Sequence, residues 1–202
     1  MKILHVIDSG GFYGAEAMLV ELAVEQIKAG QSVTVCSIGT PGEPEKPVEK
    51  VCKERGVNIY PLRMKAGLNL FGGMKIVHYA KQHGFDLFHS HGYKGNILLG
   101  ILPTFIRSIP LVTTLHGWTS TKKLSKIWVY EILESMLLGQ MDAIALVSDA
   151  MTKRKGIANR KFRFIKIIPN GIGENKSDTS STDTIASKLL EMKEKGPVIG
   201  SI

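Results

Sequence analysis

KILHVIDSGGFYGAE, residues 2–16, joins an apolar, β-branched stretch to a glycine-rich turn and then to the start of a helical pattern. A turn of this kind aims backbone N–H groups and the positive end of a helix dipole at one point in space. Such a point favours an anion, most often a phosphate. The stretch therefore predicts a strand, an anion-binding turn and a helix, with a plain turn as the alternative.

The rest of the chain repeats this alternation. Helices are expected at about 15–29, 46–55, 72–83, 93–107 and 122–138, and a sixth is expected to begin after Ser148 as its N-cap. Short β-branched segments predict strands at 2–8, 32–38, 57–62, 86–90, 110–115, 142–147 and 164–168. Strands that alternate with helices indicate an α/β fold, a Rossmann-like, doubly wound, mostly parallel sheet of about seven strands with helices on both faces.

The C-terminal segment has a different character. Residues 174–184 are polar and rich in Ser, Thr and Asp, which is typical of a linker, and a short helical pattern follows at about 183–195. The final PVIGSI, 197–202, looks like a first strand. We expect one domain over 1–172 and, over 173–202, a linker, a short helix and the first strand of a truncated second domain.

Composition excludes several classes of protein. Lys and Arg number 26 against 18 Asp and Glu, a net charge of +8, but the basic residues are not interleaved with aromatic ones as in nucleic-acid binders. The charge fits a generally basic surface and a peripheral contact with an anionic membrane equally well. No apolar run approaches the roughly 18–20 residues of a membrane span. The two cysteines, Cys36 and Cys52, form no motif, so we expect reduced thiols and a cytoplasmic location.

The glycine-rich turn departs from the dinucleotide fingerprint. That fingerprint needs Gly-x-Gly-x-x-Gly and an acid at the end of the second strand. Gly11 and Gly14 fit two of the glycine positions, but Ser9 occupies the first, and the strand at 32–38 contains no acid. A nicotinamide-dependent oxidoreductase is therefore disfavoured, and no cofactor is expected.

Histidines stand at the ends of two predicted strands, where open sheets of this type bind their ligands. His89 and His91 are two residues apart and share one face, but no third ligand stands nearby in the sequence, so no metal site is expected. His116 precedes Gly117, and an imidazole there can bond a sugar hydroxyl when neutral or hold a leaving phosphate when charged, with a structural histidine as the alternative. Trp118 either stacks on a sugar or covers the edge of the core.

Other catalytic classes lack their motifs. No pair of carboxylates is placed for glycoside hydrolysis, no Gly-x-Ser-x-Gly elbow is present, and no Walker lysine follows the first turn. Hydrolase and kinase activities are therefore disfavoured.

Six motifs taken in order resemble the N-terminal domain of a GT-B fold glycosyltransferase of family 4, also called group 1. They are GGFYGAE at 10–16, LFHSHG at 87–92, VTTLHGW at 112–118, AIALVSDAM at 143–151, IIPNGI at 167–172 and PVIGSI at 197–202. The resemblance covers essentially the whole chain. It implies one half of a GT-B fold, the half that mainly holds the acceptor.

The resemblance also implies an activity and its residues. Family members transfer a sugar from a nucleotide-sugar donor to an acceptor with retention of configuration, usually without a metal. Gly11 and Gly14 would close over the donor diphosphate, and His116 would act in catalysis near the transferred sugar. The acceptor would be bound by Tyr13, Glu16, His91 and Trp118.

The same resemblance sets the expected partners and leaves one alternative. We expect the protein to bind a nucleotide-sugar donor and a carbohydrate or lipid-linked acceptor of cell-envelope polysaccharide or glycolipid synthesis. We also expect a peripheral contact with the inner face of the membrane. The resemblance places the donor half beyond residue 202, so we do not expect these residues alone to turn over. The alternative is a non-catalytic nucleotide-binding module with the same half-fold.

Overall fold

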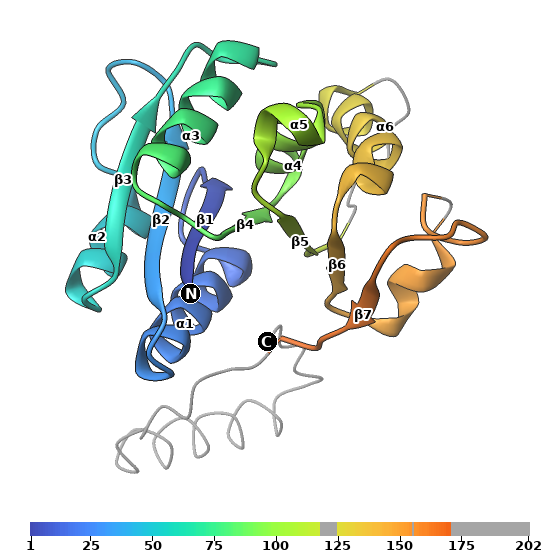
Figure 1. Cartoon of the computed structure of the whole chain (residues 1–202), viewed down its shortest axis with the longest axis horizontal. Coiled ribbons are helices and arrows are strands. Elements are labelled where there is room, and N and C mark those ends of the chain that lie inside the picture. Colours follow the sequence, from blue (N-terminus) through green and yellow to red (C-terminus); the bar gives the residue numbers. More distant parts are fainter. Residues whose placement is uncertain (118–124, 155, 171–202) are drawn as a thin grey trace, which may run out of the picture. The chain divides into compact units, whose positions relative to one another are not determined.

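Seven parallel strands form one sheet in the order β3-β2-β1-β4-β5-β6-β7, as the computed structural model shows (Figure 1). The structure describes residues 1–117, 125–154 and 156–170. The strands are β1 Lys2–Asp8, β2 Ser32–Gly39, β3 Asn58–Arg63, β4 Leu87–His91, β5 Leu111–Leu115, β6 Ala143–Leu146 and β7 Ile165–Ile167. The predicted α/β, doubly wound, parallel architecture is confirmed.

Helices cover both faces of this sheet (Figure 1). They are α1 Gly14–Lys28, α2 Pro47–Glu54, α3 Leu70–Gln82, α4 Tyr93–Gly100, α5 Thr104–Arg107 and α6 Lys126–Leu137, with the 3₁₀ helices η1 Leu138–Gln140 and η2 Asp149–Lys153. One core packs α1 and α2 against the sheet, and a second core packs α3 and α4 against the other face. Two cores on one sheet are the expected result of side chains that alternate along each strand.

Strand β1 contributes to both cores because its side chains alternate. Leu4 and Val6 lie in the core beneath α3 and α4, whereas Ile7 lies in the core beneath α1 and α2. His5 falls between two apolar positions and is completely buried. A polar ring in the middle of a buried strand needs hydrogen-bond partners, and residues of the candidate functional site provide them.

Two predicted helices differ from the structure. The expected helix at 93–107 is two helices, because Pro103 disfavours a helical conformation at the preceding residue and instead forms the N-cap of α5. The helix expected after Ser148 is the short 3₁₀ helix η2, and the Ser148 side chain makes no capping bond. Of the helix expected at 122–138, residues 122–124 lie outside the described residues, and α6 begins at Lys126.

The predicted second segment, 173–202, also lies outside the described residues, so the domain boundary stays a prediction. Within the described part of the chain, no helix is long and apolar enough to cross a membrane.

Candidate functional site

A pocket of about 440 Å³ opens at the carboxyl ends of β1, β4 and β5, beside the first turns of α1 and α4. Strand order reverses between β1 and β4, because the chain adds β2 and β3 on one side of β1 and later strands on the other. Ligands of doubly wound sheets bind at this switch point, since the loops there diverge to opposite faces. The topology therefore places the pocket where this fold class binds ligands.

Four of the predicted site residues line this pocket: Tyr13, Glu16, His91 and His116. Gly11 and Gly14 are close in sequence but are not among its lining residues. Trp118 lies outside the described residues. The structure thus brings these four residues together at one pocket, whereas their roles in binding and catalysis, and the role of the glycines in binding phosphate, stay predictions.

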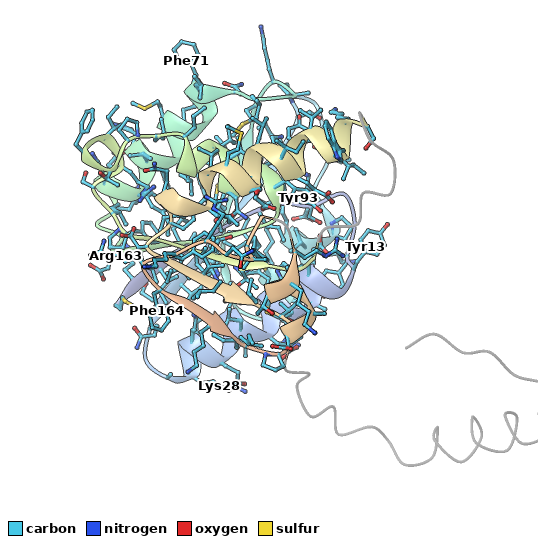
Figure 2. All side chains as sticks on the ribbon, turned by 90° about the vertical axis from the view of Figure 1, so that its right-hand side faces the viewer. Tyr13, Lys28, Phe71, Tyr93, Arg163 and Phe164 are labelled. Carbon is cyan, nitrogen blue, oxygen red and sulfur yellow. The ribbon has the colours of Figure 1, made fainter. Side chains whose placement is uncertain are left out.

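Hydrogen bonds within the glycine-rich turn hold it against α1. The Ser9 hydroxyl donates to the Gly11 carbonyl, and the backbone N–H of Tyr13 donates to the Glu16 carboxylate at 2.9 Å. Glu16 is only 7% exposed and stands in the first turn of α1, where the helix dipole favours a negative charge. A carboxylate therefore already occupies part of the positive end of the helix. Tyr13 itself is exposed and lies at the molecular surface in Figure 2.

Lys46, just before α2, anchors the base of the turn and is a residue that sequence reasoning missed. Its buried ammonium donates to the Ser9 carbonyl at 2.7 Å and to the Ile38 carbonyl at 2.5 Å. It also pairs with Asp8 at 3.4 Å. Lys46 thereby joins the carboxyl ends of β1 and β2. The sequence gives no sign of this, because the lysine precedes a short helix and looks like a solvated residue.

A cluster of imidazoles extends from the pocket, which His91 and His116 line, into the α1 face of the sheet. His5 Nδ1 is 3.0 Å from His91 Nε2, and His5 Nε2 is 2.8 Å from Gln26 Oε1 on α1. His116 Nε2 is 3.5 Å from His91 Nδ1. His89, which pairs with His5 in the β1–β4 register, bonds the Thr114 hydroxyl at 2.8 Å. The predicted shared face of His89 and His91 is confirmed.

Burial keeps these rings neutral. It lowers the pKa of His5 to about 4, although the bond to Gln26 acts in the opposite direction. Burial, reinforced by the neighbouring imidazoles, also holds the pKa of His89 and of His91 well below the usual range. The pKa of His116 is lowered by burial and raised in part by the Glu16 carboxylate. At neutral pH the cluster consists of hydrogen-bonding rings and carries no charge.

His5 supplies the third histidine that the sequence did not bring near His89 and His91. Ring nitrogens of the three lie within 4.8 Å of one another, close enough to hold a metal ion. In the structure the facing nitrogens of His5 and His91 instead bond each other. A metal would have to replace that bond, and the expected absence of a metal stays a prediction.

Carboxylates give the pocket its polarity. Asp8, Glu16 and Glu134 all line it. Asp8 is paired with Lys94 at 3.0 Å, and buried Glu134 accepts a hydrogen bond from the Asn96 amide at 2.5 Å. Carboxylate oxygens accept several hydrogen bonds each, so this lining suits a ligand rich in hydroxyl groups better than a second anion.

One polar atom of the pocket lacks a partner. His116 Nδ1 is buried, and none of the described residues offers it a hydrogen bond. Gly117 follows with φ of 125°, a conformation that favours glycine. A buried ring nitrogen without a partner is a place for a ligand hydroxyl, which can donate or accept a hydrogen bond.

A sequence model of Glycosyltransferase Family 4 matches residues 12–176 of this chain. No curated protein matches. Among solved structures, Alr3699/HepE of Anabaena in complex with UDP superposes with a TM-score of 0.68 and 21% identity, over 93% of this chain and 50% of that one.

Two further structures show the same fold. A glycosyltransferase of Rickettsia africae has a TM-score of 0.60 and 15% identity over 93% of this chain and 49% of that one. S. aureus MnaA in a co-structure with UDP has a TM-score of 0.58 and 16% identity over 90% of this chain and 50% of that one. The chain thus spans about half the length of these proteins, and at such identities the likeness is one of fold.

Proposed function

Because the chain belongs to Glycosyltransferase Family 4, we propose that it forms the acceptor-side half of an enzyme that transfers a sugar from a nucleotide-sugar donor with retention of configuration. The observation that carries this proposal is the pocket at the switch point. It combines buried carboxylates with an unpaired histidine nitrogen, which suits a ligand rich in hydroxyl groups.

In this proposal the pocket binds the acceptor, and His116 contacts the reacting sugars. Glu16 and His91 orient acceptor hydroxyls, Tyr13 offers an exposed ring at the rim, and Trp118 is proposed as a further acceptor-binding residue. Gly11 and Gly14 lie beside the pocket, where their backbone N–H groups would meet a donor diphosphate and stabilise the charge that develops on it. No metal takes part.

Transfer can be tested on the complete gene product. Release of UDP or GDP from nucleotide sugars is measured with carbohydrate and lipid-linked acceptors, for the wild type, for His116→Ala and for His78→Ala. His78 is an exposed residue of α3 and serves as the matched control. Loss of a positioned contact to the reacting atoms is expected to lower kcat roughly 10²-fold for His116→Ala alone. Equal rates in the three proteins would remove His116 from the mechanism.

The competing function is a non-catalytic nucleotide-binding module. Two of the structures with the same fold were solved with UDP, which motivates this alternative. Calorimetry of the 202-residue chain with UDP, GDP and their sugars separates the two. The transferase proposal expects weak or no binding, because it assigns the nucleotide to a donor half. Tight binding by these residues alone would favour the binding module.

We further propose that the acceptor is met at a membrane surface, in cell-envelope polysaccharide or glycolipid synthesis. Between residues 64 and 130 the sequence contains a single acid, Asp86, which accepts a bond from the Lys2 N–H at the amino end of β1. The same segment contributes α3, α4, α5 and the start of α6, which lie on one face of the sheet (Figure 1). Its exposed lysines among the described residues are Lys65, Lys75, Lys81 and Lys126.

Apolar side chains stand on the same face as these lysines. Phe71 is 84% exposed and points away from the sheet in Figure 2, and Phe105 is 81% exposed. The two belong to helices that touch, since the Lys81 ammonium on α3 donates to the Ile106 carbonyl on α5 at 2.7 Å. Exposed aromatic rings and lysines in a segment whose sequence contains a single acid are the combination that binds anionic lipid surfaces.

A further inference from the structure

Three of the imidazoles, His5, His91 and His116, form a directional row of hydrogen bonds that ends on a side-chain amide. In order, Gln26 Oε1, His5, His91 and His116 are joined by contacts of 2.8, 3.0 and 3.5 Å. In every link an Nε2 atom faces an acceptor, which is the amide oxygen in the first link and an Nδ1 atom in the other two. These contacts therefore connect the last turn of α1 to the pocket, through the buried centre of the sheet.

The amide oxygen fixes the direction of the whole row. Gln26 Oε1 can only accept, so His5 must donate from Nε2, and a neutral ring then has only a bare Nδ1 left. That bare nitrogen requires the His91 proton to be on Nε2. The same reasoning places the His116 proton on Nε2 and leaves His116 Nδ1 bare.

This assignment agrees with an independent observation. His116 Nδ1 is buried, and no described residue offers it a partner. The opposite polarity would put an N–H at that position, and a buried N–H without an acceptor is rarer and more costly than an unpaired acceptor. The lowered pKa of His5, His91 and His116 keeps the rings in the neutral form that the row requires.

We propose that Gln26 is a positioning residue, which acts through His5 and His91 to hold His116 in the tautomer whose bare Nδ1 accepts a hydrogen bond from a hydroxyl of the ligand in the pocket. The row of hydrogen-bonded imidazoles fixes the tautomer of His116 and does not conduct protons. A proton that arrived at His116 Nδ1 would have to displace the Nε2 protons in turn, and the last would have to bind an amide oxygen, which is not basic.

The nature of the hydroxyl rests on the proposed function, because only a sugar acceptor or donor makes it part of a transfer reaction. The assignment of the His116 tautomer does not rest on the proposed function. The tautomer can be measured on this chain without any activity, so failure of the transferase proposal and failure of the tautomer assignment are separate results.

The test is ¹⁵N NMR of histidine-labelled protein at pH 7.5, where protonated and bare ring nitrogens have well separated shifts. His116 signals are identified by their loss in His116→Asn. We expect His5, His91 and His116 of the wild type to carry their protons on Nε2. A wild-type His116 with its proton on Nδ1 overturns the proposal, and this result needs no variant to fold.

Substitutions of Gln26 then test its role. Gln26→Glu keeps an accepting oxygen and should keep the wild-type tautomers. Gln26→Lys offers only donors and should reverse all three rings, so that His116 carries its proton on Nδ1. Gln26→Met offers neither, and should populate both tautomers of His116. All three side chains are compatible with a helix.

Gln140→Met is the matched control, because Gln140 is exposed and its side chain is not in contact with a histidine of the row. It should leave the spectrum of the three rings unchanged. A His116 tautomer that stays the same in Gln26→Lys and Gln26→Met would show that the ring is set by its own pocket, and would overturn the role of Gln26.

Discussion

His5 Nδ1 and His91 Nε2 lie 3.0 Å apart on adjacent central strands, and both side chains are buried. The sheet thus contains neutral imidazoles that must stay uncharged for the core to remain closed. This has a direct consequence for stability, because the same rings become protonated readily in the unfolded chain.

We expect the free energy of unfolding to fall as the pH drops below about 6.5, the ordinary pKa of histidine. Between that pH and the folded pKa of His5, about 4, the unfolded state binds a proton that the folded state excludes. His5 contributes a loss of about 3 kcal/mol at the lower end of the window, at 1.36 kcal/mol per pKa unit, and His89 and His91 add to it because their pKa values are also lowered.

Urea unfolding between pH 7.5 and 4 measures this slope. His5→Gln removes one of the titrating rings and should flatten the curve, whereas His78→Gln, on the exposed side of α3, should not. A wild-type curve that is flat through this window would contradict the neutral cluster.

The fold was predictable from the sequence because its determinants are local. Alternating β-branched strands and helices, each ended by glycine or proline, were enough for the parallel sheet and its seven strands. The error at 93–107 was also local: Pro103 lies inside an apolar pattern that continues on both sides, so periodicity alone carried the helix through it.

The site was predictable only where its residues follow strands. His91 and His116 were found because each stands at a strand end, and such ends meet at one edge of a parallel sheet. His5 and Lys46 were missed, because their roles depend on strand pairing and on a contact across 37 residues of sequence. Two-residue spacing revealed the shared face of His89 and His91, but only the β1–β4 register brings His5 beside them.

Arg107 joins four parts of the fold, and its loss should be costly. The guanidinium is 1% exposed and donates to the carbonyls of Leu99, Ile109 and Gln140 and to the Asp142 carboxylate at distances of 3.0–3.3 Å. Arg107→Leu removes the donor from the three carbonyls, whereas Asp142 keeps Arg163 and the Leu111 N–H as donors. We expect the free energy of unfolding to drop by several kcal/mol, because each buried acceptor left unsatisfied costs about 1–3 kcal/mol.

Arg163→Leu is the control for this substitution, because Arg163 binds the other oxygen of the same Asp142 at 2.9 Å but is exposed. Exposed pairs contribute less than about 1 kcal/mol. Chemical denaturation of both variants gives the comparison, and similar losses for the two would refute the structural role of Arg107.

Helices α3 and α4 approach closely at Gly73. A Cβ atom at this position would lie 2.8 Å from the Leu98 carbonyl oxygen, which is backbone and cannot rotate away. We expect Gly73→Ala to lower the free energy of unfolding by about 1–3 kcal/mol through overpacking, which outweighs the gain in helix propensity. Lys75→Ala, on the exposed side of the same helix, should change it by less than about 0.5 kcal/mol. A stabilised Gly73→Ala would mean that the helices separate at little cost.

The proposed membrane contact can be checked with the purified chain. Cosedimentation with phosphatidylcholine vesicles should be weak and should increase when phosphatidylglycerol is added, and added salt should reverse the increase. Phe71→Ser with Phe105→Ser should weaken binding roughly a hundredfold or more, since each ring contributes about 1.5–3 kcal/mol when buried in lipid. Phe164→Ser, at an exposed ring beside β7, is the control. Binding that ignores both lipid charge and the paired phenylalanines would rule out this surface.

In the glycine-rich turn, a substitution can show whether a glycine is required for folding or for binding the donor. Gly14 has no positive φ, and a Cβ atom there would have no neighbour within 4 Å. Nothing in the described fold thus requires glycine at the first residue of α1. Gly14→Ala should therefore fold as well as the wild type, with a change in the free energy of unfolding below about 1 kcal/mol.

If the Gly14 N–H faces a donor diphosphate, however, the added methyl group stands where the phosphate must approach the backbone. In the complete gene product we then expect KM for the nucleotide sugar to rise in Gly14→Ala, with little change in stability. Gly10→Ala is the matched variant in the same turn, since a Cβ atom there also has open space around it. A rise in KM for Gly14→Ala and not for Gly10→Ala assigns the phosphate to the helix N-terminus. An unchanged KM in both variants would mean that the donor diphosphate binds elsewhere. The positive end of the α1 dipole would then stabilise the Glu16 carboxylate and no donor phosphate.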